Sequence, residues 1–301
     1  MNTTFPGMTL HLERRHFLRL SAVGAASFIL PVAGTGCAGS PGATALQVGG
    51  RDALVYFDTE GQVLELRPRE HRVVVRGADG AEVATLGGFG RGATELNGPA
   101  ALALGTQGRV YVADRGNHRV QVYTRDGAHV GQVGRAGKEA GQFLHPTGLG
   151  VDAQGRLLVA DSLNHRVQVF SAEGTWLGTF GAGELQLPRG IAVGPDGHIH
   201  VVDSGNARVV VYDAAFQGVG SYGHFGREGS GMMWPRTVVV DSAGTAYVAD
   251  STCNAVHVFD AAGDFVERIP LQRESRPAAA VHLALSPTGE LKVAARAGRP
   301  E

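Results

Sequence analysis

Four aspartates recur at equivalent places along the chain, each close to basic or imidazole side chains. They are Asp114, Asp161, Asp203 and Asp250. His118 and His165 follow two of them, and aspartate with histidine is a common ligand set for metal ions and a common acid–base pair. A residue that recurs in every copy of a repeat serves every copy, however. We therefore interpret the aspartates as acceptors of backbone hydrogen bonds, and Arg119, Arg166 and Arg208 as partners of those carboxylates or donors to the neighbouring unit.

The repeat itself is explicit. The segments 108–123 and 155–170 align in the same register throughout, and both contain Asn-His-Arg-Val-Gln-Val. Further copies run over 197–212 and 244–259, and degenerate copies run over 61–75 and 289–295. The last of these keeps only the first half of the pattern. The glycines that begin the six copies are 42 to 47 residues apart.

Each copy predicts four short strands. In the third copy they cover 147–151, 156–160, 166–170 and 175–180, with turns at 152–155 and 173–174. Alternating polar and apolar residues favour half-buried strands. Four strands every 40–50 residues are typical of a β-propeller, so we predict an all-β, six-bladed propeller. Because the last copy is incomplete, we expect residues 44–50 to add a closing strand to the blade built from 281–295.

Composition excludes several classes of protein. Of 301 residues 45 are glycine, which excludes a helix bundle. The net charge is −1, and removal of residues 1–36 takes away three arginines and one glutamate and leaves −3, which disfavours nucleic-acid binding. Two cysteines exclude a disulfide framework, a cysteine-based zinc cluster and a c-type haem site. We interpret Cys253 as a small buried residue, with a reactive thiol as the alternative.

The first residues predict export. Arg14-Arg15, followed by Phe17-Leu18 and a mild apolar run, resembles a twin-arginine signal; an amphipathic N-terminus or a Sec signal is the alternative. Cys37 follows that run and resembles the acylated cysteine of a lipoprotein, although Gly34 departs from the pattern and cleavage elsewhere is the alternative. We therefore expect an export signal over 1–36, a tether over 37–49 and the propeller over 50–296. The protein would lie in the periplasm or cell envelope, held to a membrane only by a lipid on Cys37.

The repeated Asn-His-Arg-Val-Gln-Val frame resembles the NHL repeat over about residues 50 to 295. The resemblance implies a six-bladed propeller. The family includes RNA-binding modules, receptor-like domains and the lyase that completes peptide amidation, and many exported bacterial members resemble ligand binders or scaffolds.

The resemblance also implies where a ligand would bind. In such repeats the proline before the innermost strand lies near one mouth of the central channel. The residues after these prolines are Ala100, Thr147, Arg189 and Arg236. The predicted ligand-binding residues are Arg189, Arg236, His145, Trp234 and His282, because two guanidiniums can hold a carboxylate or another anion bidentately. The alternative is that both arginines pair with acids across the channel or lie in solvent.

These observations favour an exported binding or scaffold module that takes a protein, a peptide or another anionic ligand at the channel mouth. We expect no catalytic residue, metal or cofactor. The alternative is a metal-dependent lyase or hydrolase that resembles the amidating lyase or the lactonase propellers. Such an enzyme needs about three ligands that converge from several blades, and the predicted inner strands are apolar. RNA binding is disfavoured by the charge and by the export signal.

Overall fold

The computed structural model describes residues 11–13, 17–20, 27–30, 53–57, 62–273 and 276–297. In these ranges the chain is almost entirely strand and turn. The helical elements are single 3-10 turns: η1 (Thr106–Gly108), η2 (Arg115–Asn117), η3 (Ser162–Asn164) and η4 (Ser204–Asn206). Over the same ranges, the structure contains no apolar helix of the length needed to cross a membrane.

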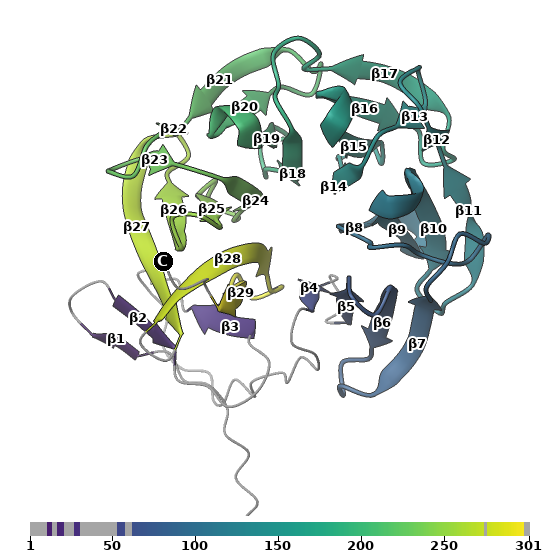
Figure 1. Cartoon of the computed structure of the whole chain (residues 1–301), viewed down its shortest axis with the longest axis horizontal. Helices are drawn as coiled ribbons and strands as arrows, with labels where there is room; N and C mark the ends of the chain where they lie inside the picture. Colours follow the sequence, from purple (N-terminus) through teal and green to yellow (C-terminus); the bar gives the residue numbers. More distant parts are fainter. Residues whose placement is uncertain are drawn as a thin grey trace, which may run out of the picture.

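Five blades of four antiparallel strands stand around a central axis as a propeller (Figure 1). Four of the blades are separate four-stranded sheets, and the fifth is part of a nine-stranded sheet. Blade one comprises β4 (Leu54–Phe57), β5 (Val63–Arg67), β6 (Arg72–Arg76) and β7 (Glu82–Gly87). Blade two comprises β8 (Leu102–Leu104), β9 (Arg109–Asp114), β10 (Arg119–Thr124) and β11 (His129–Val133). Blade three comprises β14 (Pro146–Val151), β15 (Leu157–Asp161), β16 (Arg166–Phe170) and β17 (Trp176–Phe180).

Blades four and five follow the same order from the axis outward. Blade four comprises β18 (Pro188–Val193), β19 (Ile199–Asp203), β20 (Arg208–Tyr212) and β21 (Gly218–Tyr222). Blade five comprises β24 (Pro235–Val240), β25 (Ala246–Asp250), β26 (Ala255–Phe259) and β27 (Phe265–Arg273). Short parallel pairs lie between blades: β12 (Arg135–Ala136) with β13 (Gln142–Phe143), and β22 (His224–Phe225) with β23 (Gly231–Met232).

The prediction of six blades is wrong, because the structure has five. The space between blade five and blade one is occupied by β28 (Arg276–Leu285) and β29 (Leu291–Ala297), with β28 in contact with both β24 and β4 (Figure 1). The sixth copy of the repeat contains the pattern of the two inner strands and lacks the Asn-His-Arg-Val-Gln-Val segment that builds the third strand elsewhere. The glycine that begins the sixth copy therefore marks half of a blade and not a complete one.

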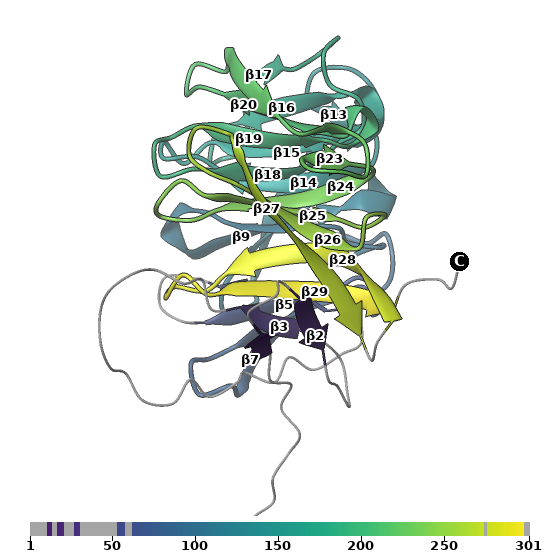
Figure 2. The same ribbon diagram turned by 90° about the vertical axis from the view of Figure 1, so that its left-hand side faces the viewer.

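Two further strands pair with β29 and with β27, and a third pairs with one of these two. β29 pairs antiparallel with β3 (Ser27–Leu30), and β27 pairs parallel with β2 (Phe17–Leu20), which pairs with β1 (His11–Glu13). The predicted closing strand at 44–50 lies outside the described residues, as does Cys37. β27 and β28 are long strands whose ends pair directly, at Gln272 with Pro277 and Arg273 with Arg276 (Figure 2).

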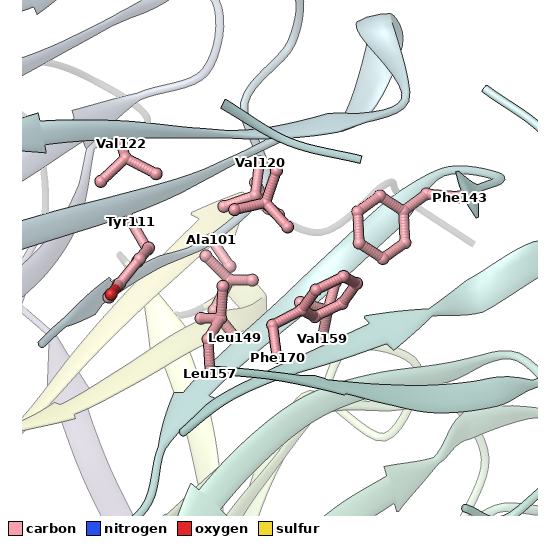
Figure 3. Close-up of a cluster of buried hydrophobic side chains, with 11 residues drawn as sticks. Ala101, Tyr111, Val120, Val122, Phe143, Leu149, Leu157, Val159 and Phe170 are labelled. Carbon is pink, nitrogen blue, oxygen red and sulfur yellow. The ribbon is translucent and has the colours of Figure 1, made fainter. Parts of the chain in front are cut away.

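The hydrophobic core is divided among the interfaces between neighbouring blades. Between blades two and three, Tyr111 and Val122 on one side pack with Leu149, Leu157 and Phe170 on the other (Figure 3). Corresponding clusters join blades one and two, three and four, four and five, and blade five with β28 and β29. Valine recurs in these strands because a β-branched side chain fits a pleated surface that is covered on both faces. Each blade is thus stabilised mainly by its two neighbours.

Candidate binding site at the channel mouth

The four repeated aspartates are fully buried, and their contacts are those that the repeat interpretation predicts. Asp161 accepts hydrogen bonds from the backbone N–H of Leu144 at 2.7 Å and from the Nε of Arg166 at 2.9 Å. The guanidinium of Arg166 also donates to the carbonyls of Glu139 and Gln142, in the segment that leads into the same blade. Asp114 and Asp203 bind Arg119 and Arg208 in the same way. These groups hold the segments between blades in place.

The histidines of the repeat also serve the joints between blades. His71, His118 and His165 all adopt left-handed backbone conformations, with φ between 54° and 57°. The Nδ1 atom of each accepts a backbone N–H from the next blade's entry segment, at Gly98, His145 and Leu187 respectively. With Nδ1 occupied in this way, His118 and His165 act as structural acceptors rather than as metal ligands.

The innermost strands reach the channel mouth through backbone irregularities. The antiparallel register of β14, β18 and β24 shifts directly after Pro146, Pro188 and Pro235, where the next residues are Thr147, Arg189 and Arg236. A bulge re-aims a side chain that a regular strand would point elsewhere. At these points adjacent inner strands nearly touch: a Cβ on Gly148 would lie 1.6 Å from the carbonyl oxygen of Arg189, and one on Gly190 would lie 2.9 Å from that of Arg236.

The structure brings Arg189 and Arg236 together. Burial is the main cause that lowers the pKa of Arg189 to about 10, and the charges of Arg236 and Arg115 contribute to the same shift. The guanidinium carbon of Arg189 lies 5.6 Å from the ring centroid of Trp234, a cation–π contact. Arg236 donates from Nε to the hydroxyl of Ser251 at 2.9 Å. Within the described part of the chain, Arg189 forms no ion pair, and its Nε is buried without a hydrogen-bond partner.

Sequence reasoning missed the third arginine of the mouth. Arg115 directly follows the repeated aspartate of blade two, where blades three, four and five have Ser162, Ser204 and Ser251. Two of these serines donate to the carbonyl of the proline that begins the next inner strand, Ser162 to Pro188 and Ser204 to Pro235. Arg115 is exposed. Its departure from serine in the aligned repeats was the signal that could have identified it.

The remaining predicted residues occupy different environments. His145 is exposed at the mouth, with its ring 5.0 Å from that of His118; partial burial, His118 and Arg115 lower its pKa. His282 is only 6% exposed, and its Nε2 donates to the carbonyl of Val55 at 3.0 Å. Its ring lies 4.6 Å from that of Tyr56. His282 therefore joins β28 to β4 in the channel wall rather than standing free at the mouth.

Below the mouth the channel contains a cavity of about 330 Å³. Its wall is formed mostly by the apolar residues of β8, β14, β18, β24 and β28, with Arg236, Thr147 and His282 among the polar ones. Arg189 lies outside this lining. The arrangement is a cationic mouth, formed by Arg115, Arg189 and Arg236, above an apolar channel.

The thiol of Cys253 is half-buried, so it is less enclosed than the small buried residue that we predicted. Burial and the charge of Asp250 raise the pKa of this thiol to about 11. A raised pKa keeps the thiol protonated, which does not favour the alternative of a reactive nucleophile.

Residues 96–123, 143–170 and 185–212 match the NHL repeat. The chain is an all-β propeller of NHL-type repeats. The matched NHL segments cover the first three strands of blades two, three and four, together with the entry segment that contacts each buried aspartate. No curated protein sequence matches the chain.

Solved structures share the fold of these NHL-type repeats at low identity. Virginiamycin B lyase from Staphylococcus aureus is 11% identical, with a TM-score of 0.60 over 77% of this chain and 74% of that one. A gluconolactonase from Xanthomonas campestris is 18% identical, with a TM-score of 0.62 over 81% of this chain and 86% of that one. A chain of the nidogen/laminin complex is 20% identical, with a TM-score of 0.57 over 73% of this chain and 80% of that one. Two enzymes and a chain of a nidogen/laminin complex thus share this fold.

Proposed function

We propose that the protein is a binding module whose channel mouth holds an anionic group of a protein or peptide. The observation that carries this proposal is the grouping of Arg115, Arg189 and Arg236 at one end of the channel. Like charges this close repel one another, and the charge of Arg236 contributes to the lowered pKa of Arg189. A carboxylate bound between the guanidiniums would remove that repulsion and supply an acceptor for the unpartnered Nε of Arg189.

The surroundings suit a carboxylate on a peptide. Trp234 offers a half-buried aromatic surface beside Arg189, and the apolar channel below accepts a hydrophobic side chain. The alternative of a metal-dependent lyase or hydrolase would place its metal in the channel. Among the residues that line the cavity, the one imidazole is that of His282, whose Nε2 is bonded to Val55. The geometry therefore favours binding over metal-dependent catalysis at this site.

The double change Arg189→Ala and Arg236→Ala tests this function. A fluorescent oligoglutamate peptide is the probe, and its affinity should fall at least tenfold, because hydrogen bonds to charged groups contribute about 1.5–3 kcal/mol each. The melting temperature should stay the same or rise slightly, since a repulsion is removed. The matched control is Arg91→Ala with Arg135→Ala, which removes the same charge from exposed inter-blade segments. Equal losses in both variants, or unfolding of the mouth variant, would contradict the assignment.

We also propose that the chain is exported and anchored by lipid on Cys37, as the arginine pair and the following apolar run suggest. Cys37→Ser should move the protein from the membrane fraction to the soluble fraction, whereas Cys253→Ser should leave it in place. Fractionation and mass spectrometry of the mature N-terminus measure this. A wild-type protein that is already soluble, with an N-terminus elsewhere, would exclude the anchor. A single lipid chain binds membranes only marginally, so more than one acyl chain is expected.

A further inference from the structure

Blade five departs from the other blades around its buried aspartate. In blade three the Oδ2 atom of Asp161 accepts from Asn164 at 2.9 Å, from Arg166 at 2.9 Å and from Gln168 at 3.0 Å. In blade five those three positions are Cys253, Ala255 and His257. An amide, a guanidinium and a second amide are thus replaced by a thiol, a methyl group and an imidazole. The replaced side chains are the ones that surround the carboxylate.

The replacements bring three potential metal ligands together. One ligand atom each of Asp250, Cys253 and His257 lies within 4.8 Å of the other two. Asp250 ends β25 and His257 lies on the adjacent β26, on the same face of the sheet, because Asp250 pairs with Ala255 and Val248 with His257. Asp250 and His257 are fully buried, and Cys253 is half-buried. The cluster is therefore held by two hydrogen-bonded strands and the tight turn between them.

His257 is buried without hydrogen bonds. Within the described residues neither Nδ1 nor Nε2 has a partner, although none of the side chain is exposed. A buried polar group without a partner costs about 1–3 kcal/mol, and native proteins contain few of them. In blades two and three the glutamine at this position uses its amide to bond loop carbonyls, as Gln121 does with Ala93 and Gln168 with Gln142. The imidazole of His257 forms no such hydrogen bond to a loop carbonyl of the described residues.

The distribution of charge around Asp250 also differs from that around the equivalent aspartates of blades two, three and four. Ala255 removes the guanidinium that pairs with the aspartate in blades two, three and four. The carboxylate of Asp250 is bonded instead by backbone N–H groups of Met233, Trp234, Thr252 and Cys253. Arg268, opposite His257 on β27, donates to the carbonyls of Arg227 and Cys253 at 2.7 and 3.0 Å. The guanidinium thus bonds the loop rather than Asp250, and one carboxylate oxygen lies within 4.8 Å of ligand atoms of Cys253 and His257.

We propose that Asp250, Cys253 and His257 form a binding site for one divalent metal ion of the zinc class. Thiolate, imidazole and carboxylate are together the ligands that Zn²⁺ prefers, with bonds of about 2.0–2.3 Å. Tetrahedral bonds of that length place ligand atoms about 3.5 Å apart, so the three groups need only small side-chain movements. The ion replaces the positive charge that arginine supplies in the other blades. On binding, the thiol proton leaves to solvent, and the fourth position is open to water.

Titration of the purified full chain with Zn²⁺ and Co²⁺ tests the site. One ion should bind per chain, and Co²⁺ should give the absorption of a tetrahedral thiolate complex. Cys253→Ser and His257→Gln should each weaken binding by more than the 10–100-fold that loss of an outer partner costs. The second variant restores the residue of blades two and three. The matched control is Cys37→Ser, which removes the only other cysteine of the chain and should leave affinity unchanged.

Several results would overturn the proposal: no stoichiometric binding by the wild type, binding that survives Cys253→Ser, or binding lost with Cys37. Should the blade-five variants fail to fold, alkylation of the Cys37→Ser protein decides the question. Zn²⁺ should then protect Cys253 from iodoacetamide at one equivalent, and unchanged alkylation would refute the site.

Discussion

The buried aspartates of the repeat show how one side chain can be held by two kinds of partner. Asp161 is held mainly by the side chains of Asn164, Arg166 and Gln168, and Asp250 by backbone N–H groups. Both carboxylates are fully buried, and both fix the segment that enters the blade. Because the backbone alone satisfies Asp250, the surrounding side chains of blade five were free to change. Cys253 and His257 therefore occupy positions that, in blade three, belong to side chains that bind the aspartate.

His282 gives a prediction about acid stability. Burial lowers the pKa of His282 to about 4, against an ordinary value of 6.5. Between pH 6.5 and pH 4 this histidine is protonated in the unfolded chain and neutral in the folded chain. The free energy of unfolding therefore falls as the pH is lowered through this range. One such histidine contributes a slope of about 1.4 kcal/mol per pH unit. Urea unfolding at several pH values should show that His282→Gln, which can still donate to Val55, reduces this slope by about one proton.

The control for that measurement is His224→Gln, which makes the same chemical change at an exposed position. If His282→Gln and the wild type unfold with the same dependence on pH, then the burial of His282 does not govern acid stability.

At the scale of the strand, the residues that follow the inner prolines depend on glycine in the neighbouring strand. Gly148 on β14 faces the backbone of Arg189 on β18, and Gly190 on β18 faces the backbone of Arg236 on β24. The absence of side chains at these two glycines lets three inner strands converge at the mouth. The bulges then turn Arg189 and Arg236 towards the same space.

Gly148→Ala should therefore be strongly destabilising. The added Cβ would lie 1.6 Å from the carbonyl oxygen of Arg189, so the inner strands of blades three and four would have to separate. We expect a loss of about 3 kcal/mol or more in the free energy of unfolding, at the upper end of overpacking effects. The control is Gly131→Ala on β11, where a Cβ meets nothing within 4 Å and the change should be about 0.5 kcal/mol or less. Chemical denaturation measures both variants, and equal losses would show that the close approach is not required.

The sequence predicted the strands well because each copy of the repeat carries the same alternation. The expected strand at 166–170 is β16 as found, and the expected strand at 147–151 differs from β14 by one residue. The bulges were not predictable, because they depend on the contact between neighbouring inner strands. Cys253 was singled out from the sequence, but His257, at a position that glutamine holds in blades two and three, was not recognised. Only the pairing of β25 with β26 shows that both lie beside Asp250.

At the scale of the molecule, each of the five blades is built from one continuous stretch of 32 to 39 residues, and its core is shared with its neighbours. For this reason the repeats in the sequence predicted a propeller correctly and predicted its last blade wrongly. The sixth copy contains the two inner strands, whereas a complete blade also needs two outer strands. The pair β28 and β29, without a complete blade around it, fills the space between blade five and blade one and completes the wall of the channel (Figure 1).

The closure of this ring has a consequence for how the protein folds. The hydrogen bond from His282 to Val55 joins residues 227 positions apart, whereas the hairpins within each blade join near neighbours in sequence. Local hairpins form in microseconds, and distant contacts must first overcome the entropy of closing a long loop. We therefore expect the blades to assemble along the chain first and the contact between β28 and β4 to form last. By the same reasoning, this seam is where the native ring would open first, so the lifetime of the folded state would be set at the seam rather than within a blade.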